Sequence, residues 1–523
     1  MKTSILRIGA NNYYITALLI IAFIFLNYLP ALDIYLMGDD FELLHESYRG
    51  WHDPSILLKP VNKFFRPLVK LSFLVDYTLF GTDVVYYKLT TILFHLVNVF
   101  LLFLLIYRIS GKRYLAGLTA LAFGSSPMYS EVVFWASGRT ESLSLMFMLG
   151  ALLLLPGTGT NPKKGLTRWI APLFLTVCAI GSKETWILLP VLAFSYVWIV
   201  KRESFTTSLK RTSVFFVLLI IYLGYFIAFP LVSGTTAPTA YAGLNFSEMV
   251  VKFQHIILHY VGMESLLADD AGHFLLFLLI ILLLSALAYR LIRTKNGLAL
   301  WGLIWMVVGI AISLPIRFMP SRYNYLPLLG FWVMVIASLD HEFKQLSLKF
   351  KIKPRTVSLG IAMLLILLLT YNAIFIQWEI NDYRIQGQAH RDIVDMYNQA
   401  KARIPRDKPI LFVNASRRKS VQEFSQSTRG YRKVLFIRDK AIRQLIFISP
   451  LANFLGDPFS EMMEPIPNRE LDAVIEGEFN VLAFNDTAFF IVNSEAPRLR
   501  EFYRNHGELP YKVEAVRFVK TNM

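Results

Sequence analysis

Carboxylates stand at a few positions where apolar segments of the chain end. Asp39 and Asp40 are adjacent and follow the first apolar run, and Glu131 interrupts a later apolar stretch. A charge at the centre of a membrane costs about 2.5–3.5 kcal/mol even on lenient scales, so a charge at the hydrocarbon boundary is solvated, paired or used. A carboxylate in such a place can take the proton from an attacking hydroxyl. Asp39, Asp40 and Glu131 are therefore the candidate catalytic residues.

Basic residues occupy comparable positions in other connecting segments. Arg66 stands in Phe-Phe-Arg-Pro-Leu, Arg139 in Ser-Gly-Arg-Thr-Glu, Lys183 in Ser-Lys-Glu-Thr, and Arg322 directly before Tyr-Asn-Tyr-Leu-Pro. Apolar and aromatic neighbours on both sides indicate that these segments enter the membrane interface. Guanidinium and ammonium groups can hold a phosphate. Acids and bases gathered on one membrane face suit a substrate with an anionic head and an apolar tail.

Each of these residues also has a simpler structural interpretation. Asp39 and Asp40 fit a solvated helix end, and Lys183 fits an ordinary charged loop. Arg66 and Arg322 fit anchors whose long side chains reach water from the interface. The histidines are scattered without the spacing of a metal motif. The residues alone leave both interpretations open.

The composition indicates which elements must position these side chains. Of the 523 residues, 55% are hydrophobic and only 17% are charged, whereas an ordinary soluble domain has about 25% charged residues. A single soluble core is excluded. The one cysteine, Cys178, excludes an intramolecular disulfide framework and a cysteine-based zinc cluster. A large membrane domain with one polar tail fits these observations.

Eleven runs contain no Asp, Glu, Lys or Arg. A helix needs about 20 apolar residues to cross a bilayer, so we expect about eleven transmembrane helices. The first run is too long for the apolar core of a signal peptide and is expected to be a retained helix. The runs are Ile8–Leu32, Leu89–Tyr107, Tyr114–Ser130, Ser142–Pro162, Trp169–Ser182, Thr185–Val200, Thr212–Ser247, Ala271–Tyr289, Asn296–Ile316, Tyr323–Leu339 and Thr356–Trp378.

The distribution of Lys and Arg predicts the orientation. With a cytoplasmic N-terminus, the cytoplasmic loops hold roughly two thirds of the basic residues before Asn381, and only Glu203, Asp340 and Glu342 as acids. The net charge of +16 therefore reflects membrane topology, and no nucleic-acid partner is expected. An odd number of spans places the tail outside, in the periplasm of a bacterium or the lumen of the endoplasmic reticulum.

The tail, Asn381–Met523, has the charge balance of a soluble domain. We predict a transmembrane domain over residues 1–380 and a small extracytoplasmic α/β domain over residues 381–523. Helices are expected at Asp392–Arg403 and Pro497–His506. Strands are expected at short, β-branched apolar runs: Pro409–Val413, Val434–Ile437, Leu445–Ile448, Val481–Phe484 and Ala488–Val492.

Several segments, taken in order, resemble the membrane glycosyltransferases of the GT-C superfamily, close to the protein O-mannosyltransferases and to related transmembrane proteins that carry tetratricopeptide repeats. The resemblance covers about residues 30–330, and the tail shows no 34-residue period. The segments that carry the resemblance are Asp39-Asp40, Phe65-Arg66-Pro67-Leu68, the His-Leu-Val-Asn-Val of His95–Val99, the Pro-x-x-x-Glu-x-Val-x-Trp-x-x-Gly-Arg of Pro127–Arg139, Ser182–Thr185 and the Arg-Tyr-x-Tyr-Leu-Pro of Arg322–Pro327.

The resemblance implies transfer of a sugar from a polyprenyl-phosphate donor to an acceptor hydroxyl on the extracytoplasmic side, in one inverting step. Asp39 would be the general base, supported by Asp40, and Glu131 would orient the sugar or the acceptor. Donor-phosphate binding would fall to Arg66, Arg139, Lys183 and Arg322, and substrate binding to Tyr323 and Tyr325.

Participation of a divalent cation is left open, and no organic cofactor is expected. The sugar stays open, as does the acceptor: a protein, a glycan or a lipid. A transporter or a flippase for lipid-linked glycans is the main alternative, although the acids cluster at one membrane face and no matching halves are visible. A non-catalytic envelope assembly protein is the second alternative, and it predicts that Asp39, Glu131 and Arg322 are dispersed in space.

Overall fold

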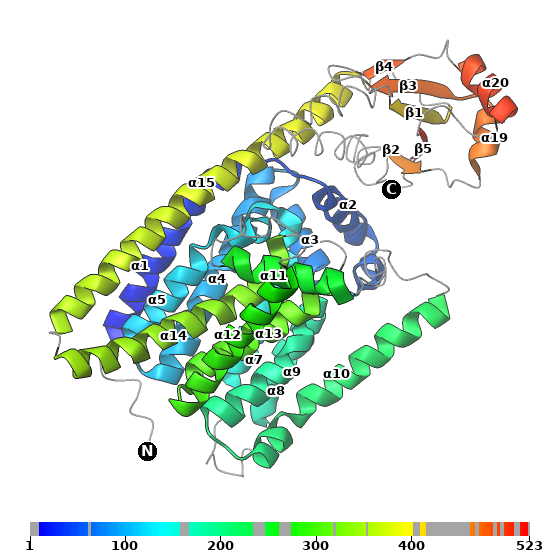
Figure 1. The fold of residues 1–523 in the computed structure, drawn as a ribbon. Coiled ribbons are helices and arrows are strands. Elements are labelled where there is room, and N and C mark those ends of the chain that lie inside the picture. Colours follow the sequence, from blue (N-terminus) through cyan, green and yellow to red (C-terminus); the bar gives the residue numbers. More distant parts are fainter. Residues whose placement is uncertain are drawn as a thin grey trace. The chain divides into compact units, whose positions relative to one another are not determined.

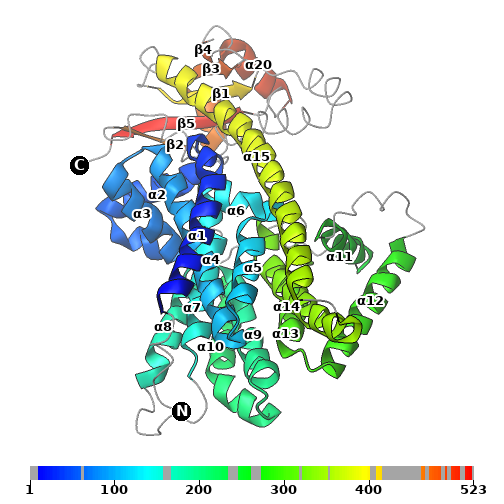
Figure 2. The same cartoon turned by 90° about the vertical axis from the view of Figure 1, so that its left-hand side faces the viewer.

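The computed structural model describes most of the chain, and Figures 1 and 2 show its course in two views. The described residues are 10–60, 64–156, 167–233, 246–260, 273–316, 321–351, 354–400, 408–414, 461–465, 470–484, 489–491, 496–506 and 513–520.

The chain divides into two compact units. The helical unit comprises Met1–Leu32, Leu58–Val69 and Lys88–Glu379. The second unit comprises Asp33–Leu57, Lys70–Tyr87 and Ile380–Met523. The predicted division into residues 1–380 and 381–523 stays a prediction, because the second unit also takes in two segments from the N-terminal part of the chain.

Apolar helices make up most of the helical unit. Within the described residues, six helical stretches are long and apolar enough to cross a membrane: Tyr14–Asp33, Val84–Ser110, Phe205–Tyr225, Leu275–Arg293, Ser321–Phe350 and Met363–Asp392. The helices are α1 (Ala10–Tyr28), α4 (Val84–Ser110), α5 (Arg113–Gly124), α6 (Ser130–Phe134), α7 (Arg139–Leu154), α8 (Thr167–Ile180), α9 (Leu189–Ser195), α10 (Phe205–Ser233), α11 (Phe246–Tyr260), α12 (His273–Arg293), α13 (Gly297–Ser313), α14 (Tyr325–Phe350) and α15 (Pro354–Ala400).

The predicted number of spans agrees with the structure only in part. Helical segments lie in each of the eleven apolar runs of the sequence, and three of them are shorter apolar helices: Thr167–Ile180, Glu184–Val200 and Gly297–Ser313. Helices α5 and α7 have 12 and 16 residues, fewer than the about 20 that a span needs. The structure therefore supports a membrane protein, and eleven spans remain a prediction.

Small residues bring α13 and α14 close together. A Cβ atom at Gly302 would lie 2.5 Å from the backbone nitrogen of Met334, and one at Gly330 would lie 2.5 Å from the backbone nitrogen of Met306. Such close backbone approach is the usual reason for glycine between membrane helices. The contact fixes the start of α14, and with it the short 3₁₀ turn Ser321–Asn324 that carries Arg322.

A buried polar network joins α4 to α14. His95 contacts the Tyr325 hydroxyl through Nδ1 at 2.9 Å and the Gly124 carbonyl through Nε2 at 3.0 Å. The Asn98 side-chain amide donates to the Ser142 carbonyl and to the Tyr325 hydroxyl. Buried polar groups need such partners. The His-Leu-Val-Asn-Val segment thus has a structural function, because it locks two helices in register.

The first α-helix of the second unit is the amphipathic helix α2 (Asp39–His52), which buries Phe41 and Leu44 and carries three acids in its first turn. The chain just before α2 is held by the far end of α15. Arg384 forms two hydrogen bonds with Asp33, at 2.9 and 3.1 Å. Helix α3 (Pro67–Phe80) follows, and Lys70 on it pairs with Glu46 on α2 at 3.0 Å.

Among its described residues, the C-terminal part of the second unit contains a mixed five-stranded sheet in the order β2-β5-β1-β3-β4. The strands are β1 (Ile410–Asn414), β2 (Glu461–Pro465), β3 (Asn480–Phe484), β4 (Phe489–Ile491) and β5 (Val513–Lys520). The β1 strand pairs parallel with β3 and antiparallel with β5. Two helices, α19 (Leu471–Glu476) and α20 (Ala496–His506), contact each other through Arg504 and Glu476.

Three predicted strands coincide with β1, β3 and β4, and the helix predicted at Pro497–His506 coincides with α20. Strands β2 and β5 were not predicted, since charges interrupt their apolar pattern. The helix predicted at Asp392–Arg403 overlaps the end of α15. The predicted strands Val434–Ile437 and Leu445–Ile448 lie outside the described residues.

Candidate functional site

Two loops of the helical unit meet through one backbone contact. The N–H of Leu68, at the start of α3, donates to the carbonyl of Gly181 at 3.0 Å, and a Cβ atom at Gly181 would lie 3.3 Å from Pro67. The Phe-Arg-Pro-Leu segment is therefore packed against the turn that precedes Lys183. This contact places Arg66 beside Glu184.

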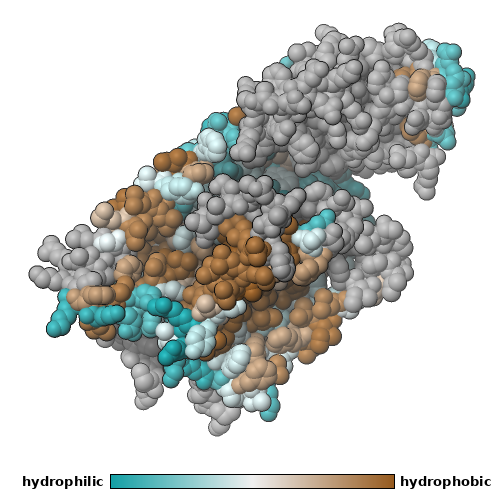
Figure 3. Space-filling model, in the orientation of Figure 1, coloured by the Kyte–Doolittle hydropathy of each residue, from teal (hydrophilic) through white to brown (hydrophobic). Residues whose placement is uncertain are grey.

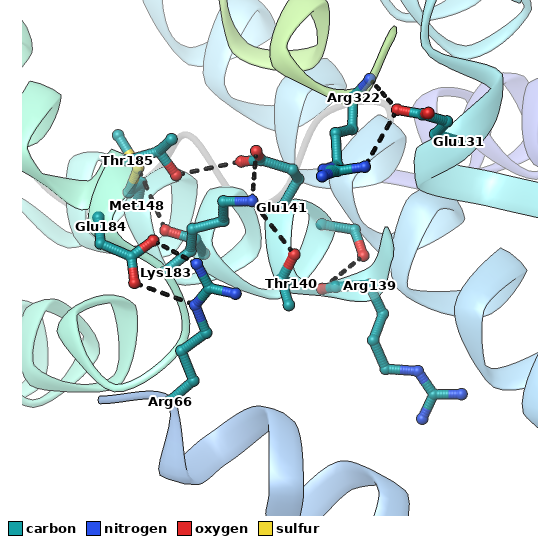
Figure 4. A network of polar contacts seen from close by, with 12 residues as sticks. Arg66, Glu131, Arg139, Thr140, Glu141, Met148, Lys183, Glu184, Thr185 and Arg322 are labelled. Carbon is teal, nitrogen blue, oxygen red and sulfur yellow. Dashed lines mark hydrogen bonds and ion pairs between the residues drawn. The ribbon is translucent and has the colours of Figure 1, made fainter. Parts of the chain in front are cut away.

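Arg66 and Glu184 form a two-pronged ion pair. The Arg66 Nε donates to Oε1 at 3.0 Å and Nη2 donates to Oε2 at 2.7 Å, and Figure 4 shows the two groups facing each other. This is the fork geometry in which guanidinium binds planar anions. The side chains are 27% and 20% exposed, so the pair lies at the edge of the site.

A second ion pair lies deeper. Lys183 Nζ is 2.9 Å from Glu141 Oε1, and the two side chains are only 6% and 1% exposed. The Thr185 hydroxyl donates to the other oxygen of Glu141 at 3.1 Å. Burial lowers the pKa of Lys183 below its ordinary value, an effect that Glu141 opposes and Arg66 and Arg322 reinforce. The ammonium is thus held in a poorly solvated place among other cations.

Glu131 holds the Arg322 turn. Its Oε2 accepts from the backbone N–H of Arg322 at 3.0 Å and lies 3.4 Å from Nη1 of the same residue. Gly138 makes the Glu131 loop possible, because a Cβ atom there would lie 2.1 Å from the Glu131 carbonyl oxygen. The Trp-x-x-Gly-Arg motif therefore requires its glycine for space.

Tyr323 lies among the cations of the cluster. Lys183 Nζ is 5.4 Å from its ring centroid, and the Arg322 guanidinium carbon is 5.5 Å away. Arg322 also lies 5.1 Å from the ring centroid of Trp135. Cations at such distances over aromatic faces are attracted to the ring. Arg66, Lys183, Arg322 and Tyr323, together with Glu131, Glu141 and Glu184, thus form one group, which we name the cation cluster.

Arg139 points elsewhere. Its guanidinium is directed away from the other labelled side chains in Figure 4. The residue is completely buried, and its Nε donates to the Thr91 hydroxyl and to the Ala136 carbonyl. These contacts fasten the start of α7 to α4. Binding of the donor phosphate by Arg139 stays a prediction that these contacts do not support.

Tyr325 is fully buried, and its hydroxyl is occupied by His95 and Asn98. Its ring packs edge-on against Tyr129, with centroids 4.8 Å apart. The environment is that of a core residue at the start of α14. Tyr323 lies among the cations and Tyr325 in the core, and substrate binding by either tyrosine stays a prediction.

The two aspartates at the start of α2, in the second unit, lie in different environments. Asp40 is completely buried and its Oδ2 accepts from the Met37 N–H at 3.0 Å. Asp39 is exposed. Acids in the first turn of a helix also stabilise it against the helix dipole. Asp40 therefore shapes the turn around Gly38, which has a φ of 52°, and a catalytic role for Asp39 stays a prediction.

The sequence did not single out the rest of the acidic face of α2. Asp39, Glu42 and Glu46 are spaced by three and four residues, and so share one side of the helix. Burial, with the charges of Asp39 and Glu46, raises the pKa of Glu42 to about 7, although Lys70 opposes this. The helical spacing was the signal that could have revealed this face.

The roles of Glu141 and Glu184 were also missed. Glu184 stands inside the Ser182–Thr185 segment and Glu141 two residues after the Pro127–Arg139 segment, but only the fold shows that each pairs with a particular cation. As to metals, no group of three or more His, Cys, Asp or Glu side chains in the described part of the chain is arranged to hold an ion.

Comparisons with known proteins complete this description. No family model matches the sequence, and no curated protein matches it. Among solved structures, the chain is similar to ArnT from Cupriavidus metallidurans bound to undecaprenyl phosphate, at 14% identity and a TM-score of 0.48, over 91% of this chain and 97% of that one. It is also similar to the oligosaccharyltransferase of Archaeoglobus fulgidus tethered to an acceptor peptide, at 11% identity and a TM-score of 0.45, over 92% of this chain and 74% of that one.

Proposed function

We propose that this chain is an integral-membrane glycosyltransferase of the GT-C type. It transfers a sugar from a polyprenyl-phosphate donor to an acceptor hydroxyl on the extracytoplasmic side of the membrane. Asp39 is the general base, and attack at the anomeric carbon inverts the configuration in one displacement.

The observation that carries this proposal is the convergence of Arg66, Lys183 and Arg322 from three loops that are far apart in the sequence. The leaving group of the proposed reaction is already a phosphate, so it needs stabilisation of its charge more than a proton. Preorganised cations in a poorly solvated site supply this stabilisation. Long apolar helices around the cluster suit a donor with a lipid tail.

The three cations are suited to different parts of the task. Arg66 and Arg322 have side chains that are 27% and 24% exposed, so they can exchange their carboxylate partners for donor oxygens. The Lys183 side chain is only 6% exposed, so it stabilises the phosphate through its charge without direct contact. Glu131 keeps Arg322 in place through its backbone and side chain, and is therefore a positioning residue in this mechanism.

Asp39 takes the acceptor proton as the new glycosidic bond forms and the bond to the phosphate breaks. The sugar carbon passes from the phosphate oxygen to the acceptor oxygen, and the proton ends on the Asp39 carboxylate. Asp40 contributes indirectly, because its carboxylate holds the Met37 N–H and so the turn that presents Asp39.

Separate replacement of the two aspartates tests the proposal. In membranes supplied with a radiolabelled polyprenyl-phosphate sugar and cell-envelope acceptors, D39N should lower transfer about 10²–10⁴-fold at unchanged abundance. D40N should lower both abundance and transfer, because it disturbs the turn. D83N is the matched control: Asp83 is exposed in the same unit, accepts from the Val85 N–H of its own loop, and D83N should keep full transfer.

Full transfer by D39N at normal abundance would remove Asp39 from the mechanism. Of the alternatives, the assembly protein predicts that Asp39, Glu131 and Arg322 are dispersed, and for two of these three the distance is short: the Glu131 carboxylate lies 3.0 Å from the Arg322 backbone nitrogen. A transporter would move the labelled lipid-linked sugar across the membrane with no covalent transfer, which the same assay distinguishes by separating lipid-linked from acceptor-linked label.

A further inference from the structure

A large apolar cavity lies at the other end of the helical unit from the cation cluster. Its volume is about 1260 Å³, above the about 300–1,000 Å³ of a usual small-molecule pocket. Helices α1, α5, α14 and α15 supply its walls. The apolar lining includes Ile20, Leu118, Leu121, Ile336, Leu365 and Leu368.

The mouth of this cavity is basic. Arg113 at the start of α5 and Lys344 near the end of α14 line it, together with Asp340. Lys112 lies 2.6 Å and Lys344 3.7 Å from Asp340, so this one carboxylate is shared by two lysines. Figure 3 shows hydrophilic residues gathered at the edge where α14 ends, beside a hydrophobic area.

A smaller chamber of about 240 Å³ adjoins the mouth and shares Leu115 and Asp340 with the large cavity. Lys112, Arg202 and Asn296 line it. A polar chamber with two further cations beside a long apolar chamber matches an amphiphilic ligand. The ligand's polar head would lie at the helix ends and its apolar tails among the helices.

We propose that this cavity binds one anionic glycerophospholipid. Its phosphate lies at Arg113 and Lys344, its polar head extends toward Lys112 and Arg202, and its acyl chains run along α5, α14 and α15. The cations of the two chambers outnumber Asp340, the one acid among their lining residues. Lys and Arg at a membrane surface favour anionic lipid by electrostatic attraction.

The site is separate from the proposed donor site. At about 1.5 Å per residue, Lys344 lies roughly 30 Å along α14 from Tyr325, which directly follows the turn of Arg322 and Tyr323. A donor lipid with its phosphate at the cation cluster would offer no charge to Arg113 and Lys344. The lipid proposal therefore does not rest on the proposed function.

Lipid binding to the purified full-length protein tests the proposal. After delipidation in a neutral detergent, native mass spectrometry follows titration with phosphatidylglycerol and with phosphatidylcholine of the same acyl chains. We expect one phosphatidylglycerol molecule to bind tightly and phosphatidylcholine to bind more weakly.

R113E/K344E should lower the affinity for phosphatidylglycerol about 30-fold, since each lost cation contributes roughly 5-fold to the affinity. K349E is the matched control: Lys349 is exposed on α14 but does not line the cavity, so it should change binding less than about threefold.

A second variant tests the apolar chamber without changing charge. L365W fills the space beside α15 and should weaken binding of both lipids equally, which also keeps the proposal testable if the double variant fails to fold. Equal binding of the two lipids to the wild-type protein, or an equal effect of K349E and R113E/K344E, would overturn the proposal. Displacement of phosphatidylglycerol by stoichiometric polyprenyl phosphate would also overturn it, in favour of a second polyprenyl site.

Discussion

The two ends of the helical unit carry similar ion pairs in very different surroundings. At the cation cluster, Lys183 and Glu141 are 6% and 1% exposed. At the opposite end, Arg290 on α12 and Glu342 on α14 form a two-pronged pair, yet they are 62% and 36% exposed. Helix α14 connects the two ends, because the Arg322 turn precedes it and Glu342 lies near its end.

The comparison teaches that the number of ion pairs says little about their energetic weight. An exposed pair gains little, since water solvates both partners almost as well as they solvate each other. In a buried pair, each charge has lost its water, so each depends on the other. The Lys183–Glu141 pair of the cation cluster should therefore carry more energetic weight than the exposed Arg290–Glu342 pair at the opposite end.

The largest effect should follow from removing one partner of each pair. K183M leaves Glu141 buried without its cation and should destabilise the protein by about 3–5 kcal/mol. R290M should cost about 0–1 kcal/mol. Thermal unfolding in detergent, followed by near-ultraviolet circular dichroism, measures both.

The double variant K183M/E141L sharpens this comparison. It removes both charges and should recover most of the stability that K183M loses, but not the transfer activity. Equal melting temperatures of K183M and R290M would contradict the view that the two ends differ.

Substitutions at two glycines distinguish the cost of a steric clash from the cost of a left-handed backbone conformation. G138A should cost up to about 3 kcal/mol, because its Cβ would lie 2.1 Å from the Glu131 carbonyl oxygen, and it should also lower transfer by displacing the Arg322 turn. Gly111, at the opposite end, has a φ of 67° with nothing within 4 Å of the added Cβ. G111A should cost only about 1 kcal/mol and leave transfer unchanged. A fully active G138A would refute the positioning role of the Glu131 loop.

The smallest effect concerns pH. Burial lowers the pKa of Lys183, whereas burial of Lys112 is outweighed by its hydrogen bond to Asp340, which raises the pKa of Lys112. Between the lowered pKa of Lys183 and the ordinary value of 10.5, the unfolded chain binds more protons at this residue, so stability rises with pH. The stability from Lys112 is constant below 10.5 and is lost only as pH rises through its raised pKa.

From pH 8 to pH 10, the melting temperature of the wild type relative to K183M should therefore rise. Relative to K112M it should stay level over the same range. A level difference for K183M would mean that Lys183 is better solvated than its burial indicates.

Composition and spacing by themselves determined much about this protein. Charge-free runs in Leu89–Tyr107 or Thr356–Trp378 predicted helices, because apolar length and the need to satisfy backbone groups leave few other solutions. The short β-branched runs at Pro409–Val413 and Val481–Phe484 predicted strands for a similar local reason. Strands β2 and β5 were missed, because charges interrupt their apolar pattern, and the pairing with partner strands that forms them is not visible in the sequence.

Only the tertiary structure decided which charges act together. From the sequence, Arg139 and Arg322 were both predicted to bind the donor phosphate, but Arg139 is buried against Thr91 and Arg322 lies over the ring of Trp135. The adjacent Asp39 and Asp40 differ in burial, and only the fold shows that the Asp40 carboxylate holds the Met37 N–H. The physical reason is that the free energy of a charge depends on its solvation and its neighbours, which are set by chain segments far away in the sequence.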